Sequence, residues 1–139
     1  MKNYPEVYEY FSVNPIQSEY IHTNTQPHQH YYNVDFIFKH DPLTKELVQF
    51  RYNDYDRAPH NGLSLREQRT FYENMFTLAR IVQDPANGLQ FMLRPGTVLI
   101  IDNWRVMHAR RQFKGKRIMS GCYVGRSDFL SRARALGVY

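Results

Sequence analysis

The sequence has 139 residues, a hydrophobic content of 42% and a formal net charge of +5. A chain of this size and apolar content can bury a core, which excludes a disordered tail and leaves one small domain or part of one. The 18 basic residues are spread over several predicted elements, which indicates an ordinary basic surface with a few anion-binding arginines and no nucleic-acid partner.

The cysteine content and the hydropathy exclude further classes of protein. Cys122 is the single cysteine, so the chain has no intramolecular disulfide framework and no CxxC zinc pattern. No apolar run approaches the roughly 18 residues of a membrane span. The first residues, MKNYPEVYEYF, lack the apolar core of a signal peptide and the arginines of a mitochondrial presequence. We therefore expect no membrane partner and no targeting segment in this chain.

The first elements are a short helix and a strand. Residues 5–13 predict the helix, because Pro5 suits a first helical turn and Pro15 ends the segment. Residues 16–23 predict a strand, and the polar stretch 23–30 a loop.

Two alternating segments follow. Residues 31–39 and 46–53 alternate apolar and polar side chains, which predicts half-buried strands. The Asp41-Pro42 turn lies between them, so we expect a hairpin.

One long helix is expected over residues 65–83. Ser64 with Glu67 three residues later is a capping-box pattern, and Asp84-Pro85 ends the helix. One apolar face carries Leu65, Phe71, Met75, Leu78 and Val82.

The last third predicts four more strands and a final helix. Residues 89–93 and the buried run 97–101 flank the Arg94-Pro95-Gly96 turn. Residues 106–111 and 117–124 are expected to pair across Lys114-Gly115-Lys116. Ser127 caps a helix over 128–136 that Gly137 ends. The whole is a mainly β, α+β fold with flanking helices.

His108 is the first candidate for chemistry. It follows an apolar segment and precedes several arginines. A lone histidine on a strand is usually a structural residue, but imidazole with oxygen ligands suits divalent iron. His28 and His30 share a loop and are weaker metal candidates.

Arg117 and Tyr123 are the next candidates. The planar guanidinium of Arg117 suits a bidentate clamp on a carboxylate. The two residues are six apart, so a regular strand would present both on one face. Asn53, in the polar loop RYNDYDRA at 51–58, could offer its amide to a polar substrate.

Three motifs together carry a resemblance to a known family. They are DNWRVMHARR at 102–111, RIMSGCY at 117–123 and RYNDYDRA at 51–58. From about Tyr4 to Leu136 the chain resembles the C-terminal part of the trimethyllysine and γ-butyrobetaine dioxygenases, which are Fe(II)- and 2-oxoglutarate-dependent oxygenases. The RYNDYDRA motif is more similar to the trimethyllysine branch.

The resemblance implies the C-terminal portion of a double-stranded β-helix, or jelly-roll, domain. It implies that His108 binds iron and that Arg117 pairs with 2-oxoglutarate. Asn53 and Tyr123 are expected to bind the substrate, Tyr123 as part of an aromatic cage around a trimethylammonium group. The implied cofactors are Fe(II), 2-oxoglutarate and ascorbate, and the implied reaction is a hydroxylation in carnitine biosynthesis.

The chain departs from the family at the iron ligands. The family's His-x-Asp motif is not found here, and His22-Thr23-Asn24 ends in an amide instead. We therefore expect residues 1–139 to be one partial oxygenase domain, inactive by itself.

Two alternatives remain beside this reading. One is a fragment of a γ-butyrobetaine dioxygenase; the other is a catalytically dead binding or interaction module, whose exposed strand edges would favour a homodimer. Either a mitochondrial or a cytoplasmic location is compatible with the family.

Overall fold

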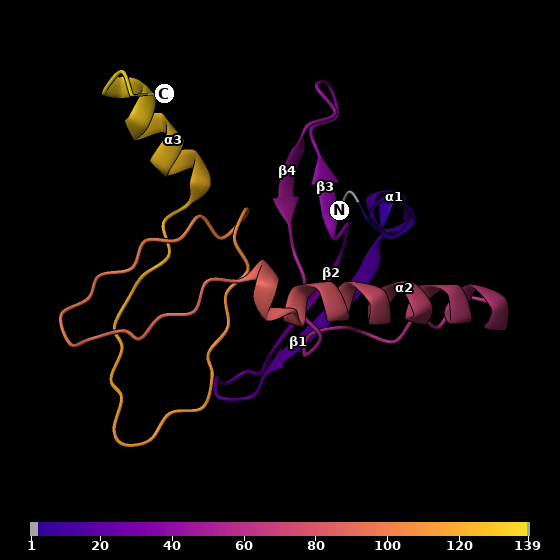
Figure 1. Cartoon of the computed structure of the whole chain (residues 1–139), viewed down its shortest axis with the longest axis horizontal. Helices are drawn as coiled ribbons and strands as arrows, with labels where there is room; N and C mark the ends of the chain where they lie inside the picture. The colour runs from indigo at the N-terminus through magenta and orange to yellow at the C-terminus, as the bar shows by residue number, and fades with distance from the viewer. Residues whose placement is uncertain (1–2, 139) are drawn as a thin grey trace. The chain divides into compact units, whose positions relative to one another are not determined.

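The computed structural model describes residues 3–138 and divides the chain into two compact units, Met1–His108 and Ala109–Tyr139 (Figure 1). The elements of the first unit are α1 (Pro5–Val13), β1 (Ile16–His22), β2 (Gln29–Asp35), β3 (Phe38–His40), β4 (Leu47–Phe50), α2 (Leu65–Gln83) and a 3-10 turn, η1 (Pro85–Asn87). The second unit contains α3 (Arg126–Ala135).

The strands form two separate antiparallel hairpins. β1 pairs with β2 in the register Ile16 to Asp35, and β3 pairs with β4 in the register Phe38 to Phe50. The predicted strand 31–39 is therefore divided between two sheets, and its expected pairing with 46–53 is confirmed only for β3 and β4. Half-burial is also wrong for β2, which is exposed along six of its seven residues.

The core of the first unit is small and lies where α1, β3 and α2 meet. α2 contributes Phe71, Met75 and Leu78 to it. The other buried residues of this core are Val7, Phe11, Ile37 and Phe38. Burying these side chains stabilises the unit because each removes apolar surface from water.

The predicted bounds of α2 are confirmed, and hydrogen bonds at its first turn explain where it begins. Ser64 Oγ accepts from the Glu67 amide at 3.4 Å, while the Ser64 amide donates to Glu67 Oε2 at 2.8 Å. This reciprocal pair satisfies donors that a helix start leaves free. Leu65 is 85% exposed, so its predicted place on the buried face is wrong: at the first position of the helix it lies outside the three-turn apolar stripe.

The predicted strands after α2 are wrong. Residues 89–93, 97–101, 106–111 and 117–124 are irregular in the structure, and Figure 1 shows this part of the ribbon as loops. Val98 and Ile100 are 84% and 91% exposed instead of buried. The physical reason is pairing: an apolar β-branched run becomes a strand only beside a neighbour that accepts its ladder hydrogen bonds, and the described residues include no paired strand after β4.

The turn at residues 94–96 and the last helix agree better with their predictions than these strands do. The Thr97 amide donates to the Arg94 carbonyl at 3.0 Å, and Gly96 has φ +83°, as the predicted turn requires. α3 ends at Ala135, two residues before Gly137, the predicted stop, whose φ is +68°. The Val138 and Gly137 amides donate to the carbonyls of Ala133 and Arg134, which completes the termination motif. Ser127 is not the cap: α3 begins at Arg126, after Gly125, without a side-chain cap.

Candidate functional site

The motif before His108 folds into a compact turn. Asp102 Oδ1 accepts from the Trp104 amide at 3.0 Å, and the Asp102 carbonyl accepts from the amides of Arg105 and Val106, each at 3.0 Å. An aspartate that bonds the backbone two residues later is a recognised turn-former, so this role was readable from the sequence. The turn holds the chain in place just before His108.

Trp104 ties this turn to β4. Its carbonyl accepts from the Phe50 amide at 2.9 Å, and Phe50 is the last residue of β4. The next residue, Arg51, opens the RYNDYDRA loop. The fold therefore attaches two of the three sequence motifs to each other inside the unit Met1–His108. His108 itself is exposed and lies outside any regular element.

Asn53 uses its amide group inside its own loop. Its Oδ1 accepts from the Tyr55 amide at 2.9 Å, and its Nδ2 donates to Asp56 Oδ2 at 2.5 Å. The Asp56 carbonyl in turn accepts from the Glu19 amide of β1 at 2.7 Å. These bonds fix the loop against the edge of β1.

The cavity beside Asn53 is small. Its volume is about 10 Å³, which is room for no more than a single water. Its polar lining comes from β1, β2 and the loop: Ser18, Asn33, Asp35, Arg51, Asn53 and Asp56. The structure thus places Asn53 in a polar niche and not in a ligand-sized space.

Arg117 and Tyr123 both belong to the second unit, Ala109–Tyr139. The Arg117 guanidinium lies over the Phe113 ring, 5.8 Å from its centroid, and an Nη donates to Met119 Sδ. Tyr123 is 97% exposed. Because residues 117–124 are not a regular strand, spacing no longer places the two side chains on one face.

The described residues do not by themselves make an iron site. No group of three histidine, cysteine, aspartate or glutamate side chains in the described part of the chain is arranged to hold a metal ion. A facial iron site needs three such ligands, and His108 could supply one of them. His28 and His30 do not form such a group either: Gln26 Nε2 and His28 Nε2 are 3.1 Å apart, and His30 Nε2 lies 2.6 Å from Glu19 Oε1.

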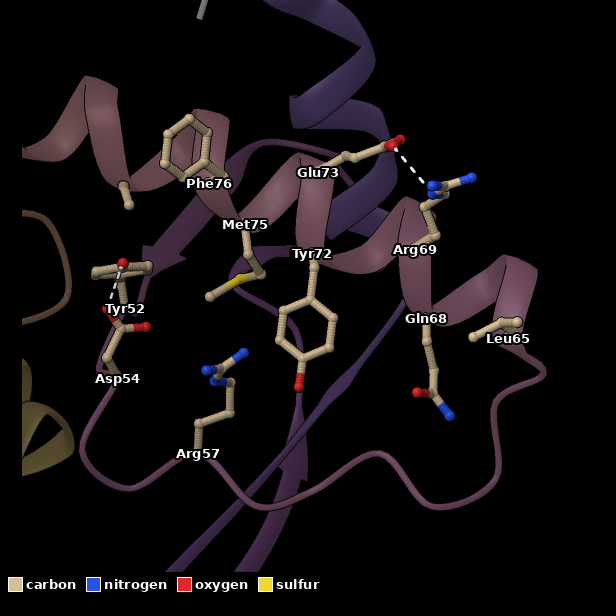
Figure 2. A pocket seen from close by; sticks show the side chains of 11 residues that line it. Tyr52, Asp54, Arg57, Leu65, Gln68, Arg69, Tyr72, Glu73, Met75 and Phe76 are labelled. Carbon is tan, nitrogen blue, oxygen red and sulfur yellow. Dashed lines mark hydrogen bonds and ion pairs between the residues drawn. The ribbon is translucent and has the colours of Figure 1, made fainter.

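A larger groove lies between α2 and the RYNDYDRA loop (Figure 2). Sequence reasoning did not find it. Arg57 from the loop lies over two rings of α2, with its Cζ 5.8 Å from the Phe71 centroid and 5.3 Å from the Tyr72 centroid. The sequence feature that could have indicated the groove is the pair of aromatic residues Tyr72 and Phe76, which lie on α2 outside its buried apolar face.

Two ionisable groups near this groove are perturbed. Burial, and then the hydrogen bond from Tyr52 Oη to Asp54 Oδ2 at 2.7 Å, raise the pKa of Tyr52 well above its usual range. Burial first, and the charge of Arg57 second, lower the pKa of His60. The His60 ring packs 4.5 Å from that of Phe71, and its Nε2 is buried with no hydrogen-bond partner in the described part of the chain.

Comparison with known proteins supplies the context for these residues. Trimethyllysine dioxygenase, mitochondrial, of Rattus norvegicus is 42% identical over 135 residues, which are 97% of this chain and 32% of that protein. The Homo sapiens protein of the same name is 40% identical over 134 residues, again 32% of its length. Gamma-butyrobetaine dioxygenase of Homo sapiens is 24% identical over 95 residues. The chain spans about a third of the length of the first two relatives.

A family model gives the broader placement. The model described as taurine catabolism dioxygenase TauD, TfdA family, matches residues 2–123. Dioxygenases of this family have a jelly-roll fold and use Fe(II) and 2-oxoglutarate. None of the helices among residues 3–138 is long and apolar enough to cross a membrane. Because the match covers well over half of the sequence, the chain belongs to the TauD/TfdA family of dioxygenases.

Proposed function

We propose that this chain is the C-terminal part of an Fe(II)- and 2-oxoglutarate-dependent dioxygenase that hydroxylates N6,N6,N6-trimethyllysine in carnitine biosynthesis. The observation that carries the proposal is the identity of 40–42% to proteins named trimethyllysine dioxygenase over nearly the whole chain. The γ-butyrobetaine enzyme remains the alternative, but its identity is 24% over 66% of the chain.

Four residues carry the proposed site. His108 supplies one iron ligand, and Arg117 pairs through its fork of donors with the far carboxylate of 2-oxoglutarate. Tyr123 offers a π-face to a trimethylammonium group, which has no N–H with which to donate. Its exposure of 97% leaves the ring accessible for that contact. Asn53 binds substrate through its amide, which requires it to exchange its bond with Asp56 or Tyr55.

The proposal treats residues 1–139 as one partial oxygenase domain. Two further iron ligands must come from outside the described residues, since those residues hold no group of three metal-binding side chains. The exposed apolar run at Val98 and Ile100 fits the same idea. In a complete domain such a run would gain neighbouring strands and become buried.

The first test uses the chain alone. It is incubated with Fe(II), ascorbate, 2-oxoglutarate and trimethyllysine, and succinate is measured. We expect no succinate above that of a His108→Ala control, because a single histidine does not hold iron in a productive geometry. Robust turnover by the chain alone would overturn the partial-domain proposal.

The second test restores the missing part. The matching 135 residues of the rat enzyme are replaced by this chain, and the chimera is assayed with trimethyllysine and with γ-butyrobetaine. We expect turnover that prefers trimethyllysine and is abolished by His108→Ala or Arg117→Gln. A folded chimera that prefers γ-butyrobetaine would favour the alternative enzyme, and one indifferent to Arg117→Gln would remove that residue from the site.

A catalytically dead interaction module is the second candidate, and the exposed apolar side chains after α2 favour it. Ile100, Ile118 and Met119 are 91%, 80% and 62% exposed, and unpaired apolar segments promote association. Sedimentation of the purified chain tests this: a homodimer or larger species supports it, and a cooperatively melting monomer contradicts it.

We propose the location and partners from the names of the relatives. Several of them are named as mitochondrial, so we propose a mitochondrial location for the parent protein, with the cytoplasm as the alternative. The proposed partner is a small trimethylammonium substrate, and no nucleic acid or membrane is involved. Fractionation of cells expressing a tagged parent protein checks the location.

A further inference from the structure

The groove between α2 and the RYNDYDRA loop contains an arginine, Arg57, whose guanidinium lies over two aromatic rings. The Arg57 guanidinium lies 5.3 Å above the Tyr72 centroid and 5.8 Å from that of Phe71. Phe71 is only 3% exposed and belongs to the core, so one of the two rings is fixed by packing. A guanidinium within about 6 Å of a ring centroid is attracted to the ring face, and the ring accepts none of the two-point hydrogen bonds that a carboxylate would accept from the guanidinium.

In the described part of the chain, no carboxylate forms an ion pair with Arg57. Among the described residues no acidic oxygen lies within 4.0 Å of its guanidinium, since the ion pairs found there involve His30, Lys39 and Arg69. Asp54, which also lines the groove, accepts a hydrogen bond from Tyr52. Figure 2 shows the Arg57 guanidinium between its own loop and Tyr72.

The groove has the size of a small-molecule site, and its lining is part apolar and part polar. Its volume is about 870 Å³, within the range of ~300–1,000 Å³ that such sites occupy. α2 lines it with the apolar or aromatic Leu65, Tyr72, Met75, Phe76 and Ala79 and with the polar Gln68, Arg69 and Glu73. Leu65 and Phe76 are 85% and 68% exposed, so their apolar surface is accessible to a ligand.

We propose that this groove binds a small amphipathic monocarboxylate, with the carboxylate on Arg57 and the apolar part against Tyr72 and Phe76. A guanidinium and a carboxylate match in planar, two-point geometry, and the apolar floor removes the remainder of the ligand from water. The site does not depend on the oxygenase role, because none of the four residues proposed for that role lines it.

The test uses the whole 139-residue chain with 4-phenylbutyrate as the probe and 4-phenylbutyramide as its neutral counterpart. Binding is followed by NMR, through ligand-induced shifts of the Tyr72 and Phe76 ring signals. We expect the acid to bind with a Kd of about 1 mM and the amide to bind at least about tenfold more weakly, since it cannot form the charge-assisted pair. Equal binding of acid and amide would overturn the proposal and show a merely apolar surface.

Matched variants test whether Arg57 provides the positive charge that binds the acid. Arg57→Lys keeps the charge but loses the planar fork, so we expect about tenfold weaker binding of the acid. Asp54→Asn removes a negative charge that would repel the carboxylate of the ligand, so this variant should bind the acid more tightly. Arg66→Gln is the control, because Arg66 is an exposed arginine of α2 that does not line the groove, and its replacement should leave the Kd unchanged. If Arg66→Gln weakens binding as much as Arg57→Lys, general positive charge and not Arg57 is responsible. Thermal melts show that each variant is folded, and the acid-to-amide ratio of the unaltered chain stands whether or not an Arg57 variant folds.

Discussion

Phe71 is the residue at which the core and the groove meet. Its ring contacts Phe11 at 6.1 Å and His60 at 4.5 Å between centroids, and it lies beneath the Arg57 guanidinium. A side chain with these neighbours joins α1, α2 and the loop after β4. Replacing Phe71 with a smaller residue should therefore weaken the packing of all three segments.

Phe71→Ala should lower the free energy of unfolding by about 3–5 kcal/mol, because it leaves a cavity in a small core. Urea denaturation measures this. Phe76→Ala is the matched control on the same helix: Phe76 is 68% exposed, so its truncation should change stability by less than about 0.5 kcal/mol. Similar effects for both variants would mean that Phe71 is not the packed residue.

His60 gives the stability of the chain a defined pH dependence. Burial and the nearby Arg57 lower the pKa of His60 in the folded state below its ordinary value of 6.5. Below that pH the unfolded chain binds the proton more readily than the folded chain does. The stability that the neutral ring contributes is therefore fully present above about pH 6.5 and is lost as the pH falls toward the folded pKa.

The measurement compares urea midpoints at about pH 7.5 and about pH 5.5 for the unaltered chain and for His60→Gln. We expect the unaltered chain to lose more stability on acidification than the variant. The other five histidines are present in both proteins, so the difference isolates His60. An identical pH dependence would show that its proton has equal affinity in the folded and unfolded states.

At the scale of elements, the helices and the strand at Ile16–His22 were predicted well, whereas the strands predicted after α2 were wrong. α1 and α2 have the predicted bounds because their limits depend on neighbouring residues: Pro5 at one start, and the capping pair Ser64 and Glu67 at the other. The RYNDYDRA loop was predicted as polar, but its contact with β1 was not. That contact consists of backbone bonds from Glu19 to Asp56 and from Ala58 to Gln17, which no local pattern specifies.

Ser64→Ala tests the local account of α2. It removes the hydroxyl that accepts from the Glu67 amide, so we expect a loss of about 1 kcal/mol. Thr77→Ala is the control, because the Thr77 hydroxyl is exposed and only donates back to the Glu73 carbonyl. Its replacement should leave the helix unchanged or slightly more stable. Circular dichroism and urea melts of the two variants distinguish capping from general polarity.

At the scale of the whole molecule, the buried core and the regular secondary structure are distributed unevenly along the chain. The first unit contains the core, whereas residues 89–125 form no helix or strand. Hydrogen exchange should therefore be slow for the α2 amides around Leu78, which is 1% exposed, and fast for residues 97–101 and 117–124.

Exchange measured by mass spectrometry on peptides from these segments checks the contrast. α3 serves as an internal reference, since it is helical but has a single buried residue, Ala133. Protection of 97–101 equal to that of α2 would mean that this run has found strand partners in solution, as an associated form of the chain would provide.

The sequence by itself determined the helices, the turn at Gly96, the end of α3 before Gly137 and the motifs that place the chain in its family. Each of these depends on residues a few positions apart, or on residue identities that relatives share. Only the tertiary structure decided which strands pair, which apolar residues are buried and where Arg57 lies. Strand pairing and burial depend on neighbours distant in sequence: the same β-branched pattern that predicts a buried strand at Val98 and Ile100 leaves both exposed where no such neighbour is present.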